Sequence, residues 1–460
     1  MKVIKVGGGC LHGNTVVAGI LDLMAVHGPG NVFVVSALNG VTDLLLKAQS
    51  RALADEDTIA ATMAELRARH MDTAAALMPS SALADFEAPL EALCRKLERL
   101  FFGLSFTREA TPRLRDAIAV FGERLSALLL AHILMARGLR AACHFPEDIG
   151  MVTDGRFGDA TADIPATKEH FHTRLASLIK PDTVTFVPGF YGLGPDGEVT
   201  TFGRGGSDYS AAVVAVALGA EILEIWKETA GFMSADPRLI PEARLIPALS
   251  FDEAAELAYF GAKILHPRTV EPLRATAITI AVKNTLNPTG QGSVITSQNV
   301  QSASCVKSVA HNANIGVLKV QASGVGARPG ILGNVAGLLG GRGINIRSVV
   351  TSQTCISLLL DQGDLEPAHD LLAEMRPGLC TRLEAIRDLA MVALVGHGMS
   401  ERIGVAARCF TAVAEAGINI EMVAFGPSPA ALYFLVRSVD LAPALRAVHA
   451  TFFEGSGCPS

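Results

Sequence analysis

The stretch Thr201–Asp208, with the sequence TFGRGGSD, combines residue types that can bind an anion. Its glycines let backbone N–H groups approach a negative charge, and the helix predicted over Tyr209–Gly219 adds the partial positive charge of its N-terminus. Arg204 can bind a carboxylate or phosphate through two parallel hydrogen bonds. Asp208 can cap the helix, orient a lysine or hold a metal ion. The stretch alone also fits an ordinary strand–loop–helix turn.

A second glycine-rich turn follows the apolar strand predicted over Lys2–Val6, which runs into three consecutive glycines. A strand that leads into glycines is typical of loops that approach a phosphate, and Lys5 lies at the mouth of this one. A helix over Asn14–Val26 and a buried strand over Asn31–Ser36 then predict a crossover between parallel strands. The polar turn after Ser36 lies where ligands bind in open α/β sheets.

One carboxylate lies in a segment predicted to be buried. The helix expected over Arg115–Gly138 contains FGERLSALLL, whose apolar residues cover most of its circumference. A buried carboxylate without a partner is costly, so Glu123 is either a surface residue of this helix or the partner of a substrate amine.

Composition narrows the class of protein. The chain has 460 residues, half of them hydrophobic and 18% charged, which predicts a folded protein of two to four domains. A net charge of −6 argues against nucleic acid or an anionic membrane as the main partner. We expect no apolar run long enough to span a bilayer and no signal peptide. Because the eight cysteines form no CxxC pair, we expect reduced thiols in the cytoplasm and no zinc site.

The order of predicted elements changes after residue 297. Before it, strands and helices alternate, as in α/β folds, and no GxGxxG follows a strand, which disfavours a dinucleotide-binding dehydrogenase. After it, two βαββαβ units repeat, each with Gly-Ile-Asn-Ile after its first helix, at Gly343–Ile346 and Gly417–Ile420. The second unit lacks a closing strand, which Val306–Ala310 is predicted to supply. The expected domains are 1–297 and 298–460, the latter with interleaved modules at about 313–387 and at 300–312 plus 388–456.

The chain resembles aspartate kinases of the amino-acid kinase superfamily. Six blocks carry the resemblance, in this order: Lys5–Gly8, Val34–Leu45, Phe121–Ala127, Phe202–Asp208, Ser234–Arg238 and Phe260–Pro267. The repeated units resemble the ACT domains of that family. The resemblance covers essentially the whole chain and implies a three-layer α/β fold with a mainly parallel central sheet, followed by two ferredoxin-like ACT modules. It is to the single-function enzymes, without a fused homoserine dehydrogenase.

The resemblance implies a reaction. ATP would phosphorylate the β-carboxylate of L-aspartate, the first step of lysine, threonine and methionine biosynthesis, and Mg²⁺ bound with ATP would share the phosphate charge. An amino-acid effector would bind the ACT modules. The resemblance also implies a homodimer joined through the ACT modules, or a dimer of dimers.

The family's site residues can be carried over to matching positions of this chain. Lys5 and Asp208 would be catalytic, and no side chain is predicted to bind metal. The aspartate-binding residues would be Ser36, Thr42, Glu123, Arg204 and Ser207. The nucleotide-binding residues would be Lys5, Gly7, Gly8, Gly206, Lys227, Glu228, Met233, Arg238 and Lys263. The effector-binding residues would be Val325, Arg328, Gly330, Ile331, Leu332, Arg347, Ser352 and Gln353.

The sequence departs from the family pattern on the nucleotide side. The usual KFGGTS is KVGGGC at Lys5–Cys10, the usual Trp-Thr-Asp is Trp226-Lys227-Glu228, and Met233 replaces an aromatic residue. Two alternatives therefore stay open. One is a related kinase with another acidic substrate, such as glutamate or acetylglutamate, and the other is a degenerate kinase that serves as an amino-acid-binding regulatory subunit.

The predicted effector site disfavours lysine. Lysine-inhibited relatives carry acidic residues at the positions that align with Arg347 and Gln353. An arginine there would repel the ε-ammonium group, because two unit charges about 4 Å apart interact by about 4 kcal/mol at an effective dielectric near 20. We expect weak or absent inhibition by lysine alone. Either a neutral effector such as threonine binds, or the site has lost its ligand.

Overall fold

The computed structural model describes residues 1–262, 264–298, 305–322, 325, 329–374, 380–426 and 428–454. The chain divides into two compact units. The first consists of Met1–Phe232, Pro247–Ala255 and Lys263–Asn299, and the second of Met233–Ile246, Glu256–Ala262 and Val300–Ser460. Two short segments that precede residue 297 thus belong to the second unit, which a single boundary at residue 297 does not anticipate.

The first unit is built on an eight-stranded sheet in the order β3-β4-β2-β1-β7-β9-β10-β8. Strands β9 and β10 pair antiparallel and the other neighbours pair parallel, which confirms the expected α/β class. The apolar runs of β2 and β4 are buried along their whole length, as is usual when helices cover both faces. The strands are β1 (Lys2–Val6), β2 (Val32–Val35), β3 (Arg140–Cys143), β4 (Thr183–Pro188), β7 (Ile222–Lys227), β8 (Ala248–Ser250), β9 (Thr279–Asn284) and β10 (Ser293–Thr296).

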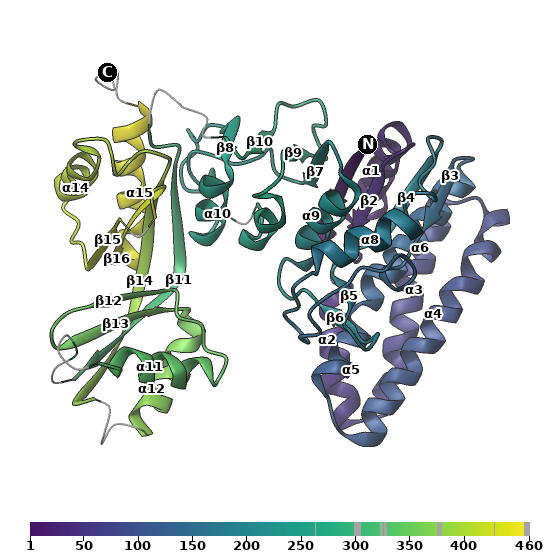
Figure 1. Ribbon diagram of the computed structural model, residues 1–460, viewed down its shortest axis with the longest axis horizontal. Helices are drawn as coiled ribbons and strands as arrows, with labels where there is room; N and C mark the ends of the chain where they lie inside the picture. The colour runs from purple at the N-terminus through teal and green to yellow at the C-terminus, as the bar shows by residue number, and fades with distance from the viewer. Residues whose placement is uncertain are drawn as a thin grey trace. The chain divides into compact units, whose positions relative to one another are not determined.

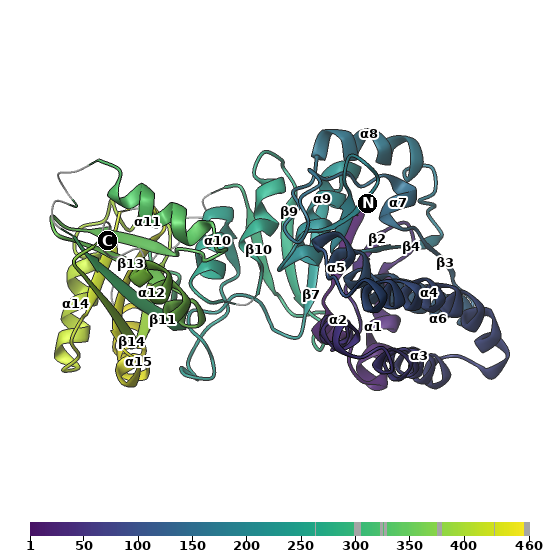
Figure 2. The same ribbon diagram turned by 90° about the horizontal axis from the view of Figure 1, so that it is seen from below.

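Helices cover both faces of this sheet. Figure 2 shows α8 and α9 on one face and α1, α3, α4 and α6 on the other, and α9 contacts β1 and β7 while α6 contacts β3 and β4. The helices of the first unit are α1 (Asn14–His27), α2 (Val41–Ala54), α3 (Thr58–Leu77), α4 (Ser80–Thr107), α5 (Pro112–Ala119), α6 (Phe121–Ala136), α7 (Pro146–Ile149), α8 (Ile164–Arg174) and α9 (Gly206–Leu218), while α10 (Phe251–Tyr259) begins in the first unit and ends in the second. Short 3₁₀ helices η1 (Gly8–Cys10) and η2 (Pro267–Leu273) and the hairpin β5 (Tyr191–Leu193) and β6 (Val199–Thr201) complete the unit.

The helix expected over Arg115–Gly138 is divided at Val120, between α5 and α6. Together these helices span Pro112–Ala136, which is long and apolar enough to cross a membrane by length and composition. The expectation that no apolar run reaches that length is therefore wrong. Of its most apolar window, 78% is buried inside the protein, as in the core helix of a globular domain.

The second unit contains a six-stranded antiparallel sheet in the order β12-β13-β11-β14-β16-β15. Its strands are β11 (Ser308–Gln321), β12 (Ser348–Thr351), β13 (Cys355–Leu360), β14 (Arg382–Val395), β15 (Met422–Phe425) and β16 (Ala431–Arg437). The two central strands, β11 and β14, lie side by side and run through the whole unit (Figure 1). Residues Ser308–Asn312 pair with Met391–Val395, whereas Ile315–Gln321 lies between β13 and the first half of β14.

These long strands differ from the expected pairs of shorter ones. Strand β11 continues through register shifts between Asn312 and Val317, and β14 passes through Asp388 with φ 58°. Bulges of this kind bend a strand without ending it. Two hydrophobic cores follow, one on each half of the sheet. They are covered by α11 (Ile331–Gly340) and α12 (Leu365–Glu374), and by α14 (Val405–Glu415) and α15 (Leu441–His449), with short turns at η3 (Gln362–Asp364), η4 (Ser438–Asp440) and the π-helical η5 (Ala450–Glu454).

The segment Met233–Ile246 is an integral part of the second unit. Ser308 Oγ donates to the Met233 carbonyl (2.8 Å), and the Val309 N–H donates to the Ser234 carbonyl (2.8 Å). The Ser234 hydroxyl also lies 3.0 Å from Nε2 of the buried His449. These hydrogen bonds explain why a segment from the middle of the chain groups with its C-terminal part.

Candidate active site

A cavity of about 360 Å³ lies just beyond the carboxyl ends of β1 and β2. Parallel strands end at the same edge of the sheet, so the turns after β1 and β2 meet there. The cavity brings together these predicted site residues: Lys5, Gly8, Ser36, Thr42, Glu123, Arg204, Gly206, Ser207 and Asp208. Nine other residues line it and were not among the predicted site residues: Gly9, Ala37, Leu38, Asn39, Gly40, Asp43, Phe190, Gly203 and Gly205.

Two lysines bind one carboxylate at this cavity. Lys5 Nζ lies 2.5 Å from Asp208 Oδ1, and Lys227 Nζ lies 3.2 Å from Asp208 Oδ2. Burial alone would raise the pKa of Asp208, but the ammonium groups of Lys5 and Lys227 hold it below its ordinary value. Burial lowers the pKa of Lys227, against the attraction of Asp208. With two cations on one carboxylate, the cluster has an excess positive charge, which suits a phosphate.

The glycines beside this cluster allow close approach of backbone. A Cβ at Gly7 would lie 3.4 Å from Lys5 Nζ, and one at Gly8 would lie 3.1 Å from the Ala37 carbonyl oxygen. A Cβ at Gly206 would lie 2.8 Å from the ring of Phe190. Side chains at these positions would therefore press on the walls of the cavity or on the lysine that lines it.

Glu123 is buried in the first turn of α6, with 4% of its surface exposed. Burial raises the pKa of Glu123 to about 8, although hydrogen bonds from the backbone and from the Ser207 hydroxyl favour the charged form. Within the described part of the chain, its Oε2 has no hydrogen-bond partner. Glu123 is therefore not a surface residue of α6: it is a buried carboxylate with an unused oxygen that lines a cavity, where a ligand ammonium group would restore its charge.

Arg204 offers the opposite charge. It is exposed at the cavity, between Gly203 and Gly205, whose φ angles of 69° and 74° favour glycine. Among the residues that the structure describes, no acidic side chain forms an ion pair with its guanidinium. A pocket with a free guanidinium and a buried carboxylate matches the two charges of a free α-amino acid.

The remaining predicted nucleotide residues do not line this cavity. Glu228 Oε1 lies 3.3 Å from His12 Nδ1. A Cβ at Gly9 would lie only 3.1 Å from the same carboxylate oxygen. The glycine at position 9 thus makes room for Glu228. Met233 and Arg238 belong to the second unit, and Lys263 lies outside the described residues.

Cys10 also departs from the family pattern, and its surroundings are those of a packed thiol. It is buried, its Sγ donates to the Trp226 carbonyl at 3.5 Å, and Thr285 Oγ1 donates to its sulfur at 3.8 Å. Burial raises the pKa of the Cys10 thiol, so it stays protonated at neutral pH.

The predicted effector residues surround α11 and β12 in the second unit. Gly330 caps α11 at φ 93°, and Arg347 and the Ser352-Gln353 turn flank the two ends of β12. The Arg347 guanidinium forms an ion pair with Asp361 and lies 5.7 Å from the centre of the Tyr259 ring. The premise of a free cation at Arg347 is therefore wrong, because Asp361 neutralises it. The other predicted residues there are Val325, Ile331 and Leu332, and Arg328 lies outside the described residues.

Comparison with known proteins decides the family. Residues 1–284 match the model of the amino acid kinase family. The chain belongs to this family. Residues 392–452 match an ACT domain. Aspartokinase 1, chloroplastic, from Arabidopsis thaliana is 31% identical to this chain, over 98% of the chain and 80% of its own length.

Two solved structures of another family member are also similar. Aspartokinase III of Escherichia coli in complex with aspartate and ADP superposes with a TM-score of 0.82, at 29% identity, over 98% of this chain and all of that one. Its complex with lysine and aspartate gives a TM-score of 0.83 at the same identity, over 98% of this chain and 99% of that one. The resemblance to aspartate kinases, first seen in six short blocks, is thus confirmed over 98% of the chain.

Proposed function

We propose that this protein transfers the γ-phosphoryl group of ATP to the β-carboxylate of L-aspartate, in the first step of aspartate-family amino-acid biosynthesis. An oxygen of the β-carboxylate forms a bond to the γ-phosphorus, the bond from that phosphorus to the β,γ-bridging oxygen breaks, and ADP leaves with the electron pair. The products are 4-phospho-L-aspartate and ADP. The E. coli relative solved with aspartate and ADP supports both substrates.

Opposite charges in the cavity would orient the amino acid. Arg204 would bind the α-carboxylate by two hydrogen bonds, and Glu123, once it has lost its proton, would bind the α-ammonium group. The α-carboxylate and the α-ammonium group of aspartate would then both be held in the cavity that Lys5 also lines. The hydroxyl groups of Ser36, Thr42 and Ser207 are the remaining polar candidates for contacts with the substrate. Fixing the acceptor in this way replaces a bimolecular encounter with an oriented one.

The single observation that carries the proposal is the pair of ammonium groups on Asp208. Lys5 lines the cavity, whereas Lys227 contacts the other carboxylate oxygen and is not among the residues that line it. We therefore assign Lys5 to the transferring phosphoryl group and Lys227 to the nucleotide side. Positive charge placed where phosphoryl oxygens gather negative charge lowers the barrier without forming a bond to the protein.

Mg²⁺ would enter with ATP as part of the substrate. Both oxygens of Asp208 are already bound by ammonium groups. Over the described ranges of the chain, one cluster of three potential metal ligands occurs, Glu366, His369 and Asp370, and it lies in the second unit. The cavity residues therefore fit a Mg²⁺ ion that is held mainly by phosphate oxygens, where the ion would neutralise part of the phosphate charge.

Release of ADP in the presence of different acids tests this function. With ATP and Mg²⁺, we expect ADP release to depend on aspartate and to stay at the background rate with glutamate or acetylglutamate. Activity with one of the other acids alone would favour a related kinase. No activity with any acid, together with calorimetric binding of an amino acid, would favour the regulatory subunit.

Lys227 gives a prediction specific to this chain. Lys227→Thr, which installs the residue usual in the family, should raise KM for ATP about tenfold, because the cluster loses a cation worth roughly 1.4 kcal/mol in nucleotide affinity. KM for aspartate should change less than twofold. Initial rates at varied ATP measure the effect, with Lys283→Met, which removes a lysine paired with Glu224, as control. If KM for ATP were unchanged or lower in Lys227→Thr, Lys227 would have no role in nucleotide binding and would only neutralise Asp208.

Regulation is proposed to depend on an amino acid bound to the first ACT module. A lysine ammonium group would compete with Arg347 for Asp361, so we expect the wild type to bind lysine weakly. Arg347→Ala should free Asp361 and tighten lysine binding about fivefold or more. Calorimetric titration with lysine and threonine measures both. Micromolar lysine binding by the wild type, unaffected by Arg347→Ala, would contradict this prediction.

We further propose a homodimer formed through the ACT modules. The two edge strands of their sheet, β12 and β15, carry exposed apolar side chains at Val349, Val423 and Phe425. Unpaired strand edges with apolar side chains are suited to pairing with a second chain. A dimer of dimers would use the same surfaces more than once.

A cytoplasmic location completes the proposal. The seven cysteines within the described ranges are free thiols. Reduced thiols are typical of a reducing compartment.

A further inference from the structure

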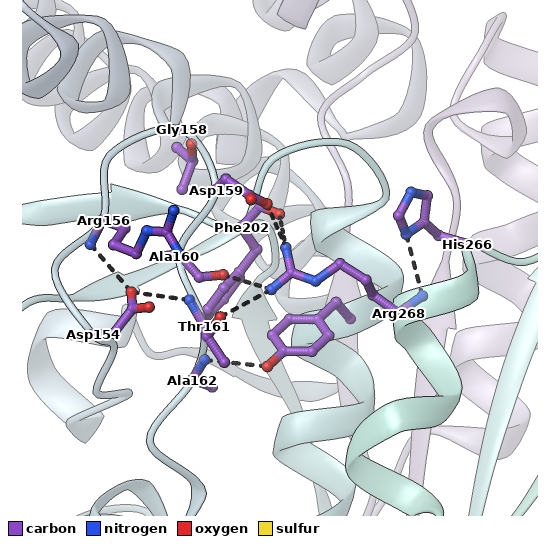
Figure 3. A network of polar contacts seen from close by, with 12 residues as sticks. Asp154, Arg156, Gly158, Asp159, Ala160, Thr161, Ala162, Phe202, His266 and Arg268 are labelled. Carbon is purple, nitrogen blue, oxygen red and sulfur yellow. Dashed lines mark hydrogen bonds and ion pairs between the residues drawn. The ribbon is translucent and has the colours of Figure 1, made fainter. Parts of the chain in front are cut away.

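Arg268 is the second residue of η2 and makes several polar contacts within the first unit. The block Phe260–Pro267, which ends just before it, gave no indication of these contacts. Figure 3 shows its guanidinium facing the loop 154–162 and Phe202, the residue that follows β6. Nη1 donates to Asp159 Oδ1 (2.8 Å) and to the Phe202 carbonyl (3.0 Å), and Nη2 donates to the Ala160 carbonyl (2.8 Å) and to Thr161 Oγ1 (3.4 Å). The guanidinium also stacks over the ring of Tyr209, with its carbon 4.6 Å from the ring centre.

The contacts of Arg268 join two segments that are far apart in sequence. One is the loop 154–162. The other contains Phe202 and Arg204 and is the stretch Thr201–Asp208, called the substrate stretch below. Tyr209 belongs to the same junction, because its hydroxyl accepts a hydrogen bond from the Ala162 N–H at 3.2 Å. The planar guanidinium of Arg268 makes these contacts at the same time through its two terminal nitrogens. A lysine ammonium group is a compact point charge and cannot do so.

Asp116 supports the same junction from α5. Its Oδ2 accepts hydrogen bonds from the N–H groups of Gly158 and Thr201, both at 2.8 Å, and its Oδ1 accepts one from Thr201 Oγ1 at 3.0 Å. Asp116 is buried, with 5% of its surface exposed. Asp116 thus holds the loop against Thr201, the last residue of β6. Arg268 holds the loop against Phe202, the residue after β6 on the side of Arg204.

The substrate stretch is packed tightly between these supports. A Cβ at Gly203 would lie 2.6 Å from the Gly158 carbonyl oxygen, and one at Gly205 would lie 2.3 Å from the His266 side chain. The backbone on both sides of Arg204 therefore rests on the loop 154–162 and on the segment that leads into Arg268. Arg204 itself has no ion-pair partner among the described residues, so its place in the cavity depends on this backbone.

We infer that Arg268 is a positioning residue for amino-acid binding, which holds the backbone that presents Arg204 to the substrate carboxylate. The inference rests on the proposed role of Arg204. Loss of the fork should let the loop and the substrate stretch move apart, and a misplacement of about 1 Å is enough to reduce catalysis about a hundredfold in other enzymes. The effect should fall on the amino acid rather than on ATP.

The test uses the full-length protein with Arg268→Met and Arg268→Lys. Hydrogen–deuterium exchange in residues 201–210 and 154–162 should rise about tenfold or more in Arg268→Met. KM for aspartate should rise about tenfold or more, with KM for ATP within about twofold, and Arg268→Lys should recover part of this loss. Arg274→Met is the matched control, since Arg274 follows the same helix but pairs with Asp252.

The two measurements separate this inference from the proposed function. Exchange is measured without substrate, so it decides the inference even if the wild type forms no aspartyl phosphate. Unchanged exchange in Arg268→Met, or an equal rise in both KM values, would overturn it. Should Arg268→Met not fold, Arg268→Lys carries both readouts.

Discussion

Lys5→Met should lower kcat by about two to three orders of magnitude, because removal of one charge that stabilises the transition state typically costs roughly 3–4 kcal/mol. Lys5 Nζ is buried at the carboxyl end of β1 and is held there by Asp208, so a solvent cation cannot replace it easily. Single-turnover measurement of ADP formation at saturating aspartate and ATP gives the rate of the chemical step.

Lys2→Met serves as the control for this variant. Lys2 lies on the same strand and pairs with Glu224 at 2.9 Å, away from Asp208. Its replacement should leave kcat within about twofold, since it contacts neither cavity nor cluster. If Lys5→Met retained more than about a tenth of wild-type kcat, Lys5 would have no role in phosphoryl transfer.

Glu123→Gln should raise KM for aspartate about 10- to 100-fold while KM for ATP changes little, because it removes the proposed charge partner of the α-ammonium group. The wild type should show a characteristic pH dependence. The pKa of Glu123 is raised to about 8, so binding an ammonium group at pH 6–7 requires proton release. The aspartate Kd should therefore fall about tenfold per pH unit between pH 6 and 8, and this slope should vanish in Glu123→Gln.

The same substitution should affect stability in the opposite sense. Between pH 4.5 and 8 the folded protein without substrate keeps a proton on Glu123 that the unfolded chain releases, so the free energy of unfolding falls as the pH rises through this range. The loss above pH 8 is on the order of 5 kcal/mol. Glu123→Gln should therefore melt at a higher temperature than the wild type at pH 8 and differ little at pH 5.

Glu87→Gln, on the exposed surface of α4, controls for the change of charge. Arg204→Met should reproduce the rise in KM for aspartate without the gain in stability, because Arg204 is exposed and forms no ion pair with the residues that the structure describes. Equal increases in KM for aspartate and ATP would assign Glu123 and Arg204 to structure rather than to recognition of the amino acid.

Residues next to strand ends were the most predictable part of the site. Lys5 and Ser36 stand beside turns whose position follows from a parallel sheet, so one sequence is enough to expect them together. Arg204 follows β6 of the antiparallel hairpin instead, and the glycines on both sides of it indicated an anion site. Glu123 was recognisable because a lone carboxylate interrupts a buried apolar helix. The cavity contains all four.

Residues whose role depends on tertiary packing were not predictable in this way. Arg268 acts on Phe202 and Asp159, which are far from it in sequence, and no local pattern indicates this contact. Arg238 belongs to the block Ser234–Arg238, which resembles part of the nucleotide site, yet hydrogen bonds to β11 place that block in the second unit. Arg347 is neutralised by Asp361, which lies fourteen residues later, directly after β13.

The most direct test of the central claim is to trap the product with hydroxylamine. Acyl phosphates react with hydroxylamine to form hydroxamates, whose position on the substrate identifies the carboxylate that was phosphorylated. With aspartate, ATP and Mg²⁺, the wild type should yield the β-hydroxamate of aspartate in step with ADP, and Lys5→Met should yield almost none. ADP release without aspartyl hydroxamate, or hydroxamate formation that persists in Lys5→Met, would contradict the account.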